Sequence, residues 1–149
     1  IEPIESSENI EAITGGDKII KEVTKDIKPY DLDWHLKKGS DSSRKLFYAL
    51  KEKIMDLGEI KEKYLQFYVS YRAGDSYISF CQVHFYKEKL LIAILIEDKK
   101  LIDSKEWVKK APKSYGWAKN CKFFNIKSEK DIKYAMDLIE QSYEFNKNR

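Results

Sequence analysis

The chain has 149 residues, the size of one domain, of which 36% are charged, 42% apolar and 13% aromatic. This composition excludes a disordered chain, and the longest apolar run, residues 90–96, is too short for a transmembrane helix. The net charge of +3 does not by itself identify a nucleic-acid-binding protein.

Residues 1–29 differ in composition from the rest of the chain. Residues 1–16 are polar and acidic and end in two glycines, as linkers do, and residues 17–28 carry apolar side chains at helical spacing up to Pro29. We therefore predict an acidic linker and lead-in helix over 1–29, and a single domain over 30–149. Because Met55 is the first methionine, we expect this domain to be the C-terminal part of a longer protein.

Two helices are predicted after the linker. Asp31 is placed to cap a single turn that ends at Gly39. Ser40 or Asp41 then begins a longer helix, and Gly58 stands where a left-handed C-cap is expected. The apolar side chains of this helix recur at three- and four-residue steps: Leu46, Phe47, Leu50, Ile54 and Leu57.

The middle of the chain reads as strands. Residues 64–72 alternate, residues 77–86 are rich in aromatic and β-branched residues, and residues 90–96 are apolar on both faces. The short connections predict an antiparallel meander. The third strand should be central, and its second face should be covered either within the chain or by another copy of it.

The C-terminal part returns to mixed structure. Ser104 is placed to begin a short helix through Lys110, and residues 121–126 read as a fourth strand. Ser128 and Asp131 form a capping box before a last helix. The fold class is therefore α+β, with an antiparallel sheet of about four strands packed against helices, in the order helix-β-β-β-short helix-β-helix.

Few residues offer catalytic chemistry. Cys81 and Cys121 are expected to be packing thiols in a reducing, cytoplasmic compartment, with a disulfide or a Cys–His nucleophile as the alternatives. His84 is interpreted as a residue on the solvent face of a strand, with a general base or a ligand-contacting residue as the alternative. The Glu97-Asp98-Lys99 tripeptide follows a strand, but the strands carry almost no acids, so no metal site, cofactor or catalytic residue is predicted.

Positive charge is concentrated in residues 105–127, which hold seven lysines against Glu106 alone, interleaved with aromatic residues. Lysines can neutralise phosphates while an aromatic side chain stacks on a base. The alternative is that these lysines are solvated and the aromatics belong to the core. The candidate nucleic-acid-binding residues are Arg72, Lys109, Lys110, Lys113, Trp117 and Lys119. The paired Lys37 and Lys38 would extend this patch.

Four segments carry a family resemblance: Trp34-His35-Leu36, Tyr68-Val69-Ser70-Tyr71, Tyr115-Gly116-Trp117 and residues 136–144. Over residues 30–145 the chain resembles a prokaryotic domain family of unknown function, sometimes labelled "predicted transport protein". Members lie at the C-terminal end of longer proteins, several with restriction-type nuclease modules, including GmrSD-like ones. The chain departs from the family where Tyr115 replaces a histidine and Ala118 a glycine. The resemblance implies an accessory domain of a DNA-defence protein and supplies no catalytic residue.

Three functions remain open. The preferred one is a non-catalytic accessory module that contacts nucleic acid or positions a nuclease. The second is an interaction module that docks on the N-terminal domain of the parent protein or forms a homodimer through residues 90–96. The third is a small-molecule cleft around Trp34, His35 and Tyr115, or an enzymatic site there. No membrane partner is expected.

Overall fold

The computed structural model describes residues 30–111 and 120–149. The chain divides after Asp31, and the fold below is that of Leu32–Arg149. The expected linker and lead-in helix lie outside the described residues.

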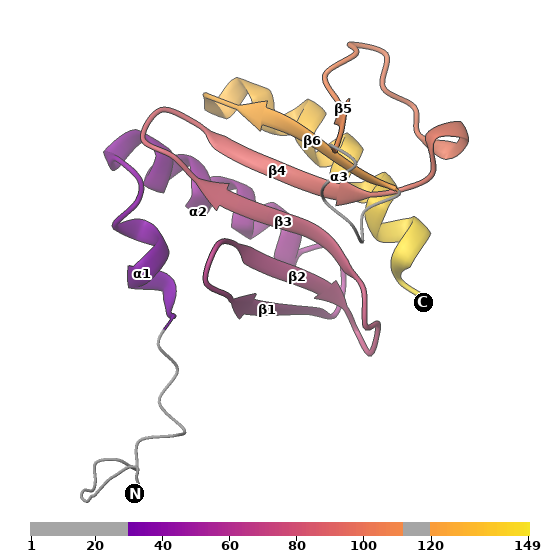
Figure 1. The fold of residues 1–149 in the computed structure, drawn as a ribbon, viewed down its shortest axis with the longest axis horizontal. Helices are drawn as coiled ribbons and strands as arrows, with labels where there is room; N and C mark the ends of the chain where they lie inside the picture. Colours follow the sequence, from indigo (N-terminus) through magenta and orange to yellow (C-terminus); the bar gives the residue numbers. More distant parts are fainter. Residues whose placement is uncertain (1–29, 112–119) are drawn as a thin grey trace, which may run out of the picture. The chain divides into compact units, whose positions relative to one another are not determined.

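The α+β fold is confirmed, with a six-stranded antiparallel sheet in place of the four strands expected (Figure 1). The helices are α1 (Leu32–Leu36), α2 (Asp41–Met55) and α3 (Ile132–Asn146), with short 3₁₀ turns η1 (Asp98–Lys100) and η3 (Glu129–Asp131). The strands are β1 (Ile60–Tyr64), β2 (Val69–Ala73), β3 (Ser79–Phe85), β4 (Leu90–Leu95), β5 (Lys109–Lys110) and β6 (Cys121–Ile126). Their order in the sheet is β1-β2-β3-β4-β6-β5.

Helices α2 and α3 pack on the same face of the sheet, behind the strands in Figure 1. The strand register aligns Val83, Ile92 and Phe124 across β3, β4 and β6, and all three are buried. The ring of Phe47 on α2 lies 4.8 Å from that of Phe85 on β3. The core is therefore a single layer between the helices and this helix-covered face.

Strand β4 is central, as predicted, because β3 and β6 flank it. Its opposite face carries Leu91, Ala93 and Leu95, which alternate with the core residues. Within the described residues no helix lies against this second, helix-free face of the sheet. Ala93 is nevertheless only 2% exposed.

Helix α2 begins where the sequence indicates. Ser40 is its N-cap, and Ser40 and Ser43 form a capping box. The predicted box of Ser128 and Asp131 is also present, before η3 and α3. The expected left-handed C-cap at Gly58 is wrong, because among described glycines only Gly74 has a positive φ.

The predicted strand 64–72 is two strands, β1 and β2, joined by a tight turn. The backbone N–H of Leu65 donates to the carbonyl of Tyr68 at 2.9 Å, and Phe67 is 68% exposed at the turn. The alternation of apolar residues continues through this turn, and no Gly, Pro, Asn or Asp marks it. The sequence pattern therefore does not indicate that the chain reverses direction here.

The predicted helix 104–110 is also wrong. The carboxylate of Asp103 accepts hydrogen bonds from the backbone N–H groups of Trp107 and Val108, at 3.1 and 2.9 Å. These bonds hold an irregular turn, and the next residues join the sheet as β5. Asp103 satisfies the backbone locally and so competes with the helix that Ser104 would have capped.

Polar side chains of α3 tie this helix to the sheet. The Ser142 hydroxyl donates to the carbonyl of Phe80 at 2.6 Å, and the Asn146 amide donates to that of Leu95 at 2.7 Å. Gln141 exchanges two hydrogen bonds of 2.8 Å with the backbone of Ile102. These residues lie in or beside the family-like segment 136–144, so that segment serves the fold.

Candidate functional site: a basic surface at one end of the sheet

The described residues of the predicted nucleic-acid site do not form one patch. Arg72 lies half-buried on β2, on the helix-free face, whereas Lys109 and Lys110 are exposed on the edge strand β5. Strands β3, β4 and β6 lie between them, a separation of roughly 19 Å at 4.8 Å per strand. Lys113, Trp117 and Lys119 lie outside the described residues.

Part of the positive charge of residues 105–127 is neutralised. Asp98 pairs with both Lys110 and Lys122, at 2.8 and 2.7 Å. Lys122 is only 4% exposed, and its ammonium also donates to the carbonyl of Ile96 at 2.5 Å. Hydrogen bonds from Lys110 and Lys122 lower the pKa of Asp98 to about 2. This cluster fastens η1 to β5 and β6.

Trp34 and His35, two residues of the predicted cleft, both contact the sheet. His35 is fully buried, with its ring 6.2 Å from that of Tyr64 and 6.1 Å from that of Phe85. The Trp34 indole N–H donates to the carbonyl of Gln66 at 2.9 Å. Both residues seat α1 against the sheet, and Tyr115 lies outside the described residues.

His84 lies half-buried on the helix-free face of β3. Its ring centroid is 5.3 Å from that of Tyr68 and 6.5 Å from that of Phe123. Burial is the main cause that lowers the pKa of His84 to about 4, with smaller electrostatic contributions from His35 and Lys38. His84 is therefore neutral near pH 7.

The two thiols are free and buried, as expected of packing residues. Burial raises the pKa of Cys81 far above its ordinary value and that of Cys121 to about 11. Neither thiol is thus a thiolate at neutral pH. In residues 30–111 and 120–149, no three His, Cys, Asp or Glu side chains are placed to hold a metal ion.

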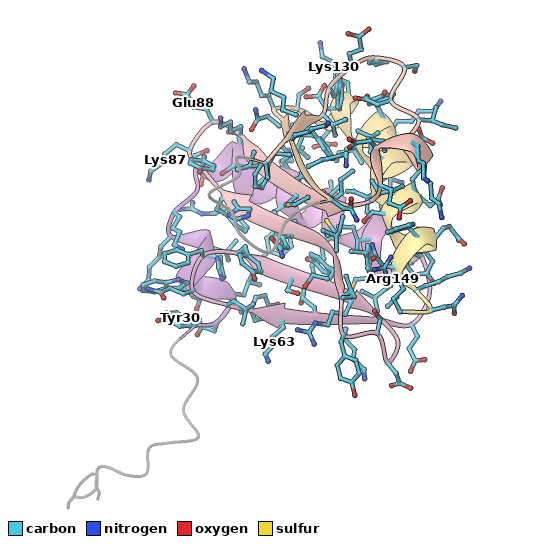
Figure 2. All side chains as sticks on the ribbon, turned by 45° about the vertical axis from the view of Figure 1, so that its right-hand side comes forward. Tyr30, Lys63, Lys87, Glu88, Lys130 and Arg149 are labelled. Carbon is cyan, nitrogen blue, oxygen red and sulfur yellow. The ribbon has the colours of Figure 1, made fainter. Side chains whose placement is uncertain are left out.

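Exposed positive charge gathers at the end of the sheet where α1 ends. We define the hairpin surface as residues 37–38, 65–68 and 86–89 together with Lys127. It holds five lysines and one acidic residue, Glu88. Figure 2 shows Lys87 and Glu88 at the tip of the β3–β4 turn, with Lys63 on the edge strand β1.

Hydrogen bonds to the α1–α2 junction hold both turns of the hairpin surface. The carbonyl of Gln66 in the β1–β2 turn accepts from Trp34 and from the ammonium of Lys38, each at 2.9 Å. The Ser40 hydroxyl donates to the carbonyl of Lys87 in the β3–β4 turn. The junction itself is tight, since a Cβ on Gly39 would lie 2.5 Å from the Ser43 hydroxyl oxygen.

The hairpin surface also exposes two aromatic side chains, Phe67 at 68% and Tyr86 at 46%. The Lys89 ammonium lies 5.3 Å from the centroid of the Tyr86 ring, and that of Lys38 lies 5.0 Å from the Trp34 ring. Partial burial lowers the pKa of Lys38. The arrangement can hold a polyanion and offers flat apolar groups beside its charges.

Sequence reasoning missed this surface because its lysines come from three separate segments. Lys37 and Lys38 were noted only as an extension of the other patch, and Lys127 only as part of the basic segment 105–127. The remaining residues of the surface could be grouped from the sequence only by noting that two hairpin turns lie at the same end of an antiparallel sheet. That step requires the β1–β2 turn to be recognised first.

Comparison with known proteins shows the family. Residues 33–146 match the model of a domain of unknown function, DUF5655. No curated protein and no solved structure matches the chain. Within the part of the chain that the structure describes, no helix has both the length and the hydropathy needed to cross a membrane. Since the match covers most of the chain, the protein belongs to the DUF5655 family.

Proposed function

We propose that the domain is a non-catalytic accessory module that contacts nucleic acid through the hairpin surface. In a longer restriction-type protein it would help to position the nuclease, as the resemblance of residues 30–145 implies. The observation that carries the proposal is the grouping of five lysines and two exposed aromatic rings around two adjacent, anchored turns.

Charge and chemistry both support this assignment. Lysines bind phosphates as point charges without reading the sequence, which suits an accessory contact. Three candidates for acid–base or nucleophilic chemistry are built into the scaffold: His35 is fully buried, and the thiols of Cys81 and Cys121 have raised pKa values. This supports a binding role over a catalytic one.

The test is fluorescence anisotropy with labelled oligonucleotides over a range of salt concentrations. We expect binding that weakens as salt rises, because counterions are released from the phosphates. The triple variant Lys37→Glu, Lys89→Glu, Lys127→Glu should abolish it. None of these three side chains makes an ion pair within the described residues.

A matched control carries the same change of charge elsewhere: Lys53→Glu, Lys99→Glu, Lys109→Glu, on the last turn of α2, on η1 and on β5. These three lysines are exposed, and this variant should retain most of the affinity. If only the control variant loses binding, the contact belongs to the β5 side of the sheet and the hairpin surface is wrong. No binding at low salt by the wild-type protein removes the function altogether.

A further inference from the structure

We infer that the hairpin surface binds single-stranded nucleic acid, with Phe67 and Tyr86 as the residues on which bases stack. This inference rests on the proposed function and names its ligand class. Both rings leave large areas in solvent, since Phe67 is 68% exposed and Tyr86 is 46% exposed. They are available to a ligand that offers flat aromatic faces.

The strand register places the two turns that carry these rings at the same end of the sheet. Val69 on β2 is paired with Val83 on β3, so the β1–β2 turn before Val69 and the β3–β4 turn after Phe85 lie at one end of these two strands. The ring of Tyr68, the residue after Phe67, lies 5.3 Å from that of His84 on β3. At one to two strand spacings, the turns that carry Phe67 and Tyr86 lie within about 10 Å of each other.

Charge accompanies each ring. The Lys89 ammonium stands over the Tyr86 ring at 5.3 Å, and Lys38 donates to the carbonyl of Gln66, next to Phe67. A base stacked on either ring would thus have an ammonium close to its own phosphate. Stacking groups with adjacent cations are the pattern by which proteins hold single strands without strict sequence preference.

The arrangement favours unpaired bases over a duplex. In a duplex the base faces stack on one another, and only edges and phosphates are accessible. Phe67 and Tyr86 offer neither a hydrogen-bond fork for base edges nor a positive charge. Two exposed rings gain contact area only where bases are unstacked.

The experiment compares a 12-nucleotide oligothymidine, a 12-nucleotide oligouridine and a 12-base-pair DNA duplex by anisotropy. We expect either single strand to bind at least tenfold more tightly than the duplex, and the two single strands distinguish DNA from RNA as the source. Phe67→Ala and Tyr86→Ala should each weaken single-strand binding by about 5- to 100-fold. The salt dependence should be unchanged because no charge is removed.

Tyr77→Ala is the matched control, since Tyr77 is 83% exposed on the β2–β3 turn, outside the hairpin surface. It should change single-strand affinity by less than twofold, and Tyr86→Phe should retain binding. Thermal melting checks that each variant is folded, which the exposure of all three rings predicts. Duplex binding as tight as single-strand binding, with both alanine variants neutral, overturns the inference and leaves the proposed function standing. Absence of any salt-dependent binding removes both.

Discussion

Lys105, Lys110 and Lys122 of the basic segment differ from the lysines of the hairpin surface, which include Lys127, in what surrounds them. In the first region Lys122 is buried, and it shares Asp98 with Lys110, while Lys105 lies over the rings of Trp107 and Tyr134. The hairpin surface holds five lysines and one acidic residue, Glu88. The region that is most basic along the chain is therefore partly neutralised, and a second basic surface is assembled in space from separate segments.

The difference teaches that a run of lysines in sequence is a weak guide to surface potential. A strand alternates its side chains between two faces, so neighbouring lysines on a strand point apart. Lys122 lies on the helix-covered face of β6 and points into the fold. Turns at one end of a sheet, in contrast, bring together lysines that are distant in the sequence.

The largest effect should come from removing the buried lysine. Lys122→Met leaves the carbonyl of Ile96 without its buried hydrogen-bond donor and removes one of the two ion pairs of Asp98. We expect the free energy of unfolding to fall by about 2–3 kcal/mol. Lys89→Met on the hairpin surface should change it by less than about 0.5 kcal/mol. Urea denaturation measures both, and equal effects would contradict the contrast between the two regions.

The two regions should also respond differently to a fall in pH. The pKa of His84 falls from 6.5 to about 4 on folding, so the unfolded chain binds more protons between these values. The stability that neutral His84 contributes is complete above pH 6.5 and is lost as the pH falls toward 4. After allowance for the partial exposure of the ring, we expect about 1–2 kcal/mol.

The measurement is the unfolding free energy from pH 7 to pH 4 for the wild-type protein and His84→Gln. The variant cannot protonate at this position, so its stability should fall less over this range. Parallel curves of unfolding free energy against pH would mean that folding does not change the pKa of His84. Asp98, whose pKa is about 2, should stay ionised throughout, and the cluster around it should remain paired.

The smallest expected effect is on the pKa values of His84 and Asp98, each of which responds to the charges close to it. The positive charge of Lys38 contributes to the low pKa of His84, and the hydrogen bond from Lys110 is the largest cause of the low pKa of Asp98. Lys38→Met should raise the pKa of His84 by a few tenths of a unit, as should Lys110→Met for Asp98. NMR titration measures each, and each variant should leave the other region's reporter unmoved.

The elements with strong local signals were predictable from the sequence. Helix α2 has an apolar stripe and a serine cap, α3 has a capping box, and β4 is apolar on both faces. The β1–β2 turn was not predictable, because Gln66 and Phe67 are not residues that favour turns. The turn at 103–108 depends on Asp103 and its bond to Tyr134 on α3, a contact between distant segments.

The candidate site was less predictable than the fold, for a physical reason. Its position follows from the β1–β2 turn, and an error there places Phe67 inside a strand and separates it from Tyr86. Trp34, His35, Gln141 and Ser142 lie in the family-like segments and hold the scaffold together. A family motif of this kind predicts the fold well and does not mark the surface that contacts a partner.

The bonds from the α1–α2 junction to the two turns have a consequence for association. Trp34, Lys38 and Ser40 hold both turns before any ligand arrives. Ordering a loop or a long side chain on binding costs conformational entropy, roughly 0.5–1.5 kcal/mol for each immobilised side chain. A surface that folding has already fixed avoids much of that cost, so the proposed contact would need less interaction energy than a mobile loop would.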